Sequence, residues 1–76
     1  MSPLKLEIGQ EAKVLGIRSD EELRSRLYSL GLSRGSILKI ESVTLLRGTY
    51  AIRVDDTTTL ALRKEELEKI EVNPLA

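Results

Sequence analysis

The chain has 76 residues, 12 basic and 12 acidic side chains, and neither cysteine nor histidine. This length allows one small domain, and the missing thiol and imidazole groups exclude disulfides, catalysis by cysteine or histidine, and the usual ligands of zinc, copper and haem. The balanced charge argues against a nucleic-acid or membrane-surface binder that depends on a broad basic field.

The apolar residues, 41% of the chain, are almost all aliphatic, since Tyr28 and Tyr50 are the only aromatic residues. Aliphatic packing of this kind suits a narrow barrel. The opening residues lack the apolar core of a signal peptide, and no apolar run approaches the roughly 20 residues that span a bilayer. We therefore expect a cytoplasmic protein without direct membrane insertion.

The chain is expected to begin with a flexible end at residues 1–3. Apolar and polar residues alternate over residues 4–8, which favours a short edge segment before a glycine turn. A first strand is predicted over residues 11–17, with Ala12 and Val14 on its buried face.

A short amphipathic helix is predicted next, because Leu23, Leu27 and Leu30 have the spacing that places three side chains on one helix face. This face is expected to close the core. Ser19 and Glu22 have the spacing of a capping box, in which each side chain satisfies a backbone donor at the start of the helix.

The predicted helix ends at a glycine. Gly31 lies where a left-handed residue would terminate the helix, and Leu27 with Leu32 would form the hydrophobic pair of a Schellman ending. Gly35 then leads the chain into the next strand.

Three more segments have strand composition. Residues 36–44 are rich in β-branched residues but do not alternate cleanly, which predicts a bulge or a strong coil. Residues 49–54 and 58–63 are predicted to pair through a turn at 55–57. That turn has no glycine, although a type I′ turn needs positive φ at its two central residues, so its geometry stays open.

One helical turn is predicted at residues 64–68, and a last short strand at Ile70 and Val72, before residues 73–76 form a flexible end. Five short strands, with one short helix between the first and the second, describe a mainly β fold that bends into a small barrel. SH3-like is the nearest architecture.

Two blocks carry a family resemblance. Residues 23–35 read L-R-S-R-L-Y-S-L-G-L-S-R-G, and residues 60–72 combine a leucine-arginine strand, an acidic turn and an I-x-V strand. Both blocks are similar to the FeoA family, small accessory proteins of bacterial ferrous-iron uptake whose SH3-like fold is shared with the C-terminal domain of DtxR-type regulators. The chain departs from the family at residues 44–49, in place of the proline-containing loop that the family often has.

The resemblance implies a single SH3-like FeoA domain over residues 4–72 and a non-enzymatic protein, without cofactor, that binds or regulates the membrane ferrous-iron transporter FeoB through its cytosolic domain. The alternative is an SH3-like regulatory module in a metal-responsive transcriptional or RNA-associated complex, which the neutral charge disfavours. An enzyme is not expected, because the chain has no imidazole, thiol, cofactor loop or G-x-S-x-G elbow. Whether the chain forms a homo-oligomer stays open.

Partner contacts are expected from a set of cationic and apolar residues near the helix and the loop after the second strand: Arg34, Leu45, Leu46, Arg47, Tyr50, Arg24 and Arg26. Arg24 and Arg26 each follow an acidic residue by four positions, so intrahelical ion pairs also explain them. Arg34 lies beyond the helix and has no such explanation. Leu45 and Leu46 would be exposed unless a partner or the core covers them.

Carboxylates at residues 55–56 and 65–68 are oxygen donors that could coordinate a hard cation. Acidic residues are also the usual solubilising choice at a hairpin tip and in the first turn of a helix. Without histidine or cysteine a tight transition-metal site is not expected. If the chain serves iron transport, we expect it to act on the transporter and not to carry the ion.

Overall fold

The computed structural model of the chain describes residues 1–44 and 48–75. Its elements, in chain order, are the 3-10 helix η1 (Pro3–Lys5), β1 (Glu11–Ile17), α1 (Glu21–Ser29), β2 (Ile37–Thr44), β3 (Thr49–Val54), β4 (Thr58–Arg63), α2 (Lys64–Leu67) and β5 (Ile70–Pro74). The predicted mainly β fold, with a short helix between the first two strands, is confirmed.

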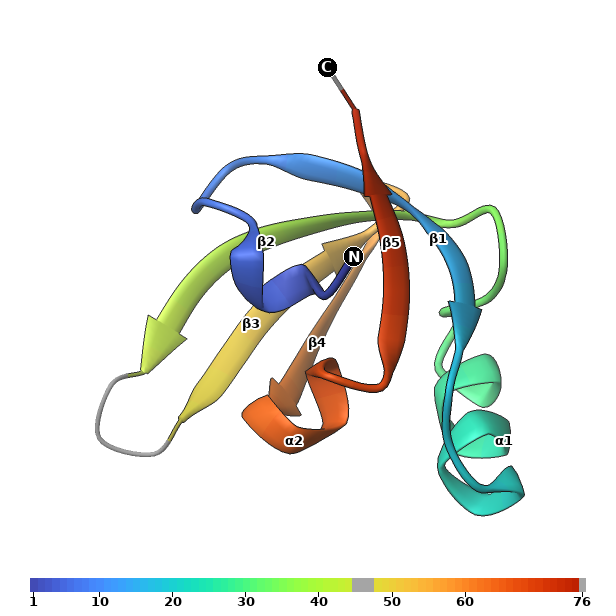
Figure 1. Ribbon diagram of the computed structural model, residues 1–76. Coiled ribbons are helices and arrows are strands. Elements are labelled where there is room, and N and C mark those ends of the chain that lie inside the picture. The colour runs from blue at the N-terminus through green and yellow to red at the C-terminus, as the bar shows by residue number, and fades with distance from the viewer. Residues whose placement is uncertain (45–47, 76) are drawn as a thin grey trace.

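The five strands form one antiparallel sheet in the order β4-β3-β2-β1-β5. Strands β1, β2 and β3 each pair with the next strand along the chain, whereas β5 returns to pair with β1. Figure 1 shows how strongly β1 and β2 curve, so that the sheet bends into a barrel-like shape with β4 and β5 as its two edges. The predicted irregularity in residues 36–44 is confirmed as a register shift between Ile40 and Ser42.

The core is entirely aliphatic. Its buried hydrophobic residues are Leu6, Ala12, Val14, Ile17, Leu27, Leu32, Leu38, Ile40, Ile52, Val54, Leu60, Leu62, Leu67, Ile70 and Val72. Every strand contributes to this set, and α1 contributes Leu27 alone as a fully buried residue. Leu23 of the same helix is partly buried and packs against this core.

The predicted capping box at the start of α1 is wrong. The helix begins at Glu21, and its N-cap is Asp20, whose Oδ1 accepts the backbone N–H of Leu23 at 3.0 Å. Ser19 lies one residue too early, and its hydroxyl donates to the carbonyl of Asp20 at 2.9 Å. A carboxylate at the N-cap also suits the positive end of the helix dipole, so Asp20 is the more favourable cap.

The predicted helix ending is confirmed. Gly31 has a φ of +98°, its N–H donates to Tyr28 at 3.0 Å, and the N–H of Leu32 donates to Leu27 at 2.9 Å. These two bonds are the Schellman pattern. The expectation that Leu30 closes the core is wrong. Leu30 is the C-cap residue of the helix and is 41% exposed, whereas Leu32 is buried.

The beginning of the chain differs from the expected edge segment at residues 4–8. Pro3 opens η1 and is buried, and the Ser2 hydroxyl caps this turn by accepting the N–H of Leu4 at 3.2 Å. Serine at the N-cap followed by proline at the first helical position favours a helical turn, which outweighs the short alternation of the following residues.

The final strand is longer than the predicted Ile70 and Val72. It continues to Pro74, which is opposite Ala12 in the β1 ladder, and the N–H of Leu75 donates to the carbonyl of Glu11 at 2.9 Å. Proline fits here because β5 is an edge strand. The described elements therefore extend past residues 4–72 at both ends.

Candidate protein-binding site

Two surface hollows lie on opposite flanks of α1. Because successive helical residues are about 100° apart, Arg24 and Arg26 point about 200° apart around the helix axis. Arg26 lines a hollow towards β4 and α2, whereas Arg24 lines a hollow towards β1. The two arginines therefore belong to different surfaces.

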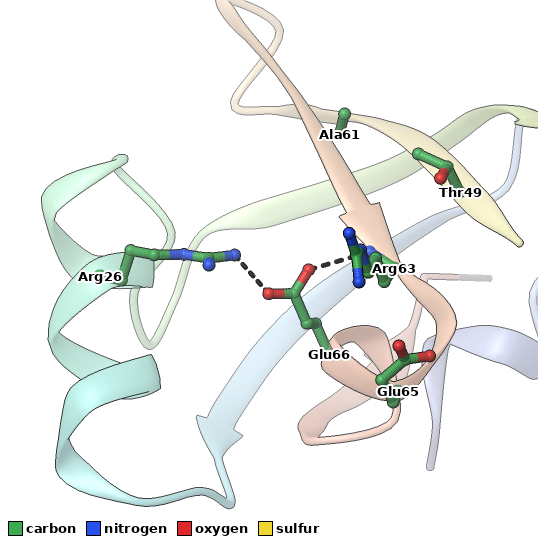
Figure 2. Close-up of a pocket in the computed structure, with 6 residues that line it drawn as sticks. All are labelled: Arg26, Thr49, Ala61, Arg63, Glu65 and Glu66. Carbon is green, nitrogen blue, oxygen red and sulfur yellow. Dashed lines mark hydrogen bonds and ion pairs between the residues drawn. The ribbon is translucent and has the colours of Figure 1, made fainter. Parts of the chain in front are cut away.

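The first hollow, of about 510 Å³, is drawn in Figure 2 and is lined by Arg26, Thr49, Ala61, Arg63, Glu65 and Glu66. Arg26 donates through Nη2 to Oε2 of Glu66, whose other oxygen accepts the backbone N–H of Arg63 at 3.0 Å. Only 19% of the Glu66 side chain is exposed. This ion pair links α1 to α2, so the charge of Arg26 is compensated by a carboxylate of the same chain.

The second hollow, of about 350 Å³, is lined by Leu15, Gly16, Ile17, Arg18, Arg24, Tyr28, Arg34 and Glu71. We call it the basic hollow, because its lining contains three arginines and one acidic residue. These residues come from β1, the β1–α1 link, α1, the α1–β2 link and β5. Parts of the chain that are distant in sequence meet there.

The acidic residue of the basic hollow is already paired. Glu71 accepts from the Met1 ammonium at 3.0 Å and from Arg18 at 2.9 Å. The hydrogen bond from Met1 holds the pKa of Glu71 below its ordinary value. Desolvation acts against this and raises the pKa, while the charge of Arg18 also lowers the pKa. Glu71 is therefore ionised near neutral pH and compensates Arg18.

Arg24 and Arg34 have no carboxylate partner among the described residues. Each donates instead to a backbone carbonyl: Arg24 through Nη2 to Ser19 at 3.2 Å, and Arg34 through Nε to Leu15 at 3.1 Å. The prediction of intrahelical ion pairs for Arg24 and Arg26 is thus wrong. Arg24 donates to the Ser19 carbonyl, and Arg26 pairs with Glu66 of α2.

A β-bulge supplies the acceptor for Arg34. In the β1–β5 ladder Val14 is opposite Val72 and Gly16 is opposite Glu71, so Leu15 is the extra residue. A bulged residue leaves the regular ladder, and bulges commonly redirect a side chain at the surface. Here the bulged residue Leu15 is exposed, and its carbonyl accepts the Nε–H of Arg34.

The apolar lining of the basic hollow is exposed. Tyr28 is 46% exposed and Leu15 is 44% exposed. The side chain of Tyr28 therefore lies at the surface, where it lines the hollow together with the three arginines. Tyrosine and arginine are among the residue types enriched in the energetically dominant parts of protein interfaces.

Of the residues expected to contact a partner, the structure brings Arg24 and Arg34 together in the basic hollow and places Arg26 on the other flank of α1. Tyr50 is half-buried, packs against the core and lines neither hollow. The three loop residues Leu45, Leu46 and Arg47 lie outside the described residues.

The sequence did not predict that the hollow is also lined by Leu15, Arg18 and Glu71. The alternation of the first strand does place Leu15 away from the core, which was a usable indication of exposure. The contact between Arg18 and Glu71 depends on the pairing of β1 with β5, and nothing local to either residue indicates it.

Other kinds of site find little support in the described part of the chain. No three acidic side chains gather there in an arrangement suited to a metal ion. Residues 1–44 and 48–75 also contain no helix with the length and apolar character needed to cross a membrane.

The FeoA domain family matches residues 4–74. The solution structure of FeoA from Chlorobium tepidum is 32% identical, with a TM-score of 0.91, and the match covers all of this chain and 71% of that one. No curated protein sequence matches this chain.

Two less similar structures share the fold. FeoA from Stenotrophomonas maltophilia in complex with zinc, an SH3-domain protein, is 22% identical with a TM-score of 0.79 over 96% of this chain and 89% of that one. A manganese-dependent transcriptional repressor is 21% identical with a TM-score of 0.90 over 99% of this chain and 36% of that one. The SH3-like architecture predicted from the sequence is therefore confirmed.

Proposed function

Since this chain belongs to the FeoA family, which is associated with ferrous iron transport, we propose that it is a non-enzymatic cytoplasmic accessory protein that binds the membrane transporter FeoB. The contact is a protein–protein interface with the cytosolic domain of FeoB. The S. maltophilia protein has been suggested to act as an activating factor for bacterial ferrous iron transport, which supports a regulatory role.

The observation that carries this proposal is the basic hollow. It combines two arginines that lack a carboxylate partner in the described residues with an exposed tyrosine and an exposed leucine. A cationic and apolar surface of this kind is suited to a protein partner. The whole sequence lacks the thiol and imidazole groups that most often act as nucleophile and general base in enzymes.

The proposal predicts that the tagged chain retains detergent-solubilised FeoB from the same organism in a pull-down. The measurement is repeated without nucleotide, with GDP and with a non-hydrolysable GTP analogue, because a regulator can prefer one state of a GTPase. The double variant Arg24→Ala with Arg34→Ala is expected to retain at least about tenfold less FeoB, as loss of paired charges at an interface does.

Lys5→Ala is the matched control, because Lys5 is exposed in η1 and lines neither hollow. It is expected to retain FeoB as the unchanged chain does. Absence of retention in all three nucleotide states, with both proteins folded, would contradict the proposed function.

A further inference from the structure

We propose that the basic hollow binds a short acidic peptide segment, with a carboxylate between Arg24 and Arg34 and a neighbouring apolar side chain on Leu15 and Tyr28. This inference rests on the proposed function in one respect, namely that the segment belongs to the transporter's cytosolic part. It adds the chemistry by which the partner is recognised.

The available hydrogen-bond donors indicate an anion. A guanidinium has five N–H donors, and Arg24 and Arg34 each use one of them on a backbone carbonyl. Neither pairs with a carboxylate of the described chain. Planar guanidinium groups bind carboxylates with two parallel hydrogen bonds, which gives both strength and orientation.

The two arginines are also held in place before a ligand arrives. Arg34 is anchored to the bulged Leu15 at 3.1 Å, and Arg24 is anchored to Ser19 at 3.2 Å. A side chain that is already ordered loses less conformational entropy on binding. The bulged residue Leu15 therefore holds Arg34 in position for a ligand.

The neighbouring ion pair restricts where the carboxylate can lie. Glu71 is ionised and bound to Arg18, so a second carboxylate at this end of the hollow would meet a like charge. Repulsion of this kind fixes the orientation of a ligand more than it adds affinity. The anionic group of the peptide is thus directed to Arg24 and Arg34.

The apolar part of the lining favours a peptide over a free phosphate. A phosphate ion has no apolar surface to cover Tyr28 and Leu15, which are 46% and 44% exposed. A leucine or valine next to a carboxylate would cover both. Nucleic acid is disfavoured, because the whole chain carries no net charge and phosphate backbones are bound mainly through excess positive charge.

The test is an NMR titration of the full chain with a capped hexapeptide that has two adjacent carboxylates between leucines. Shifts are expected at the amides of residues 15–18, 24–28 and 33–35. The same peptide with both carboxylates replaced by amides is expected to bind at least about tenfold more weakly, since the charge-assisted hydrogen bonds are lost. Inorganic phosphate and a single-stranded RNA hexamer are expected to give no comparable shifts.

Charge reversal provides the second measurement. Arg24→Glu with Arg34→Glu is expected to weaken the acidic peptide at least about tenfold, and Lys5→Glu to change its affinity less than about twofold. Tyr28→Ala, whose side chain is outside the core, is expected to weaken binding while leaving the remaining amide spectrum unchanged. The spectra of all variants report whether each is folded.

The inference is overturned if the amide peptide binds as well as the acidic one, if phosphate or RNA binds as tightly, or if charge reversal has no effect on a folded chain. Its failure is separable from that of the proposed function. Retention of FeoB that is unaffected by the charge reversal would remove the inference and leave the function standing. Peptide binding without any retention of FeoB would contradict the proposed function and leave the peptide-binding chemistry of the hollow standing, without the assignment of the segment to the transporter.

Discussion

Gly31 shows how a single residue directs its neighbours. Its φ of +98° ends α1 and turns the chain so that Leu32, and not Leu30, enters the core. A second case is the β3–β4 turn, where Asp55 and Asp56 have φ values of +51° and +61°. Aspartate tolerates this region better than most residues, so the turn left open by the sequence forms without glycine.

Replacing Gly31 by alanine is expected to lower the free energy of unfolding by about 1–2 kcal/mol, the cost of placing a Cβ in left-handed backbone. The loss would come from the backbone alone, since a Cβ at this position meets no atom within 4 Å. Urea unfolding measures it. Gly16→Ala is the control, because a Cβ there is equally free of contacts and its φ is outside the left-handed region. Equal losses for both variants would contradict this explanation.

At the scale of the element, the start of α1 depends on a cap that two adjacent residues could have supplied. The choice of Asp20 over Ser19 sets the first helical residue at Glu21 and leaves the Ser19 carbonyl as the acceptor of Arg24. The helix cap and the basic hollow are thus connected through the same short link.

Asp20→Ala is expected to destabilise the chain by about 1 kcal/mol, the usual value of an N-cap side chain, whereas Ser19→Ala is expected to change stability by less than about 0.5 kcal/mol. Thermal or urea unfolding of both variants, followed by circular dichroism, distinguishes the two caps. If Ser19→Ala proves the more damaging of the two, the capping box read from the sequence is the correct one.

At the scale of the whole molecule, the fold is closed by pairing between β1 and β5. These strands come from opposite ends of the described chain, and their ladder runs from Ile17 opposite Ile70 to Ala12 opposite Pro74. The same ladder places Arg18 beside Glu71 and creates the bulge at Leu15. The basic hollow is therefore a product of the complete fold.

Removing residues 73–76 is expected to lower the free energy of unfolding by about 2 kcal/mol or more, because two ladder pairs and the Leu75 N–H bond to Glu11 are lost at about 1 kcal/mol for each hydrogen bond. Leu75→Ala keeps that backbone bond and removes only a half-exposed side chain, so a much smaller loss is expected. Unfolding in urea compares the two. A shortened chain as stable as the original would show that β5 needs only Ile70 to Val72.

The sequence predicted the parts of this fold that depend on local patterns. Strands at residues 11–17, 49–54 and 58–63 follow from short runs of β-forming residues between turns, and the glycine ending of α1 follows from local backbone preference. The sequence did not predict the basic hollow as a whole. Arg24 and Arg34 were singled out by charge, but their meeting with Glu71 requires strand pairing across the length of the chain, which no local pattern contains.

The pairing of β1 with β5 also has a consequence for how the chain reaches this fold. Strands β2, β3 and β4 are joined by short connections and can pair early, while β1 must wait for β5 before both of its edges are bonded. Closing so long a loop is slow compared with forming a hairpin. Until β5 pairs with β1, one edge of β1 has unpaired backbone groups that can bind a strand of another chain. Newly synthesised chains are therefore most prone to aggregate before this last pairing forms.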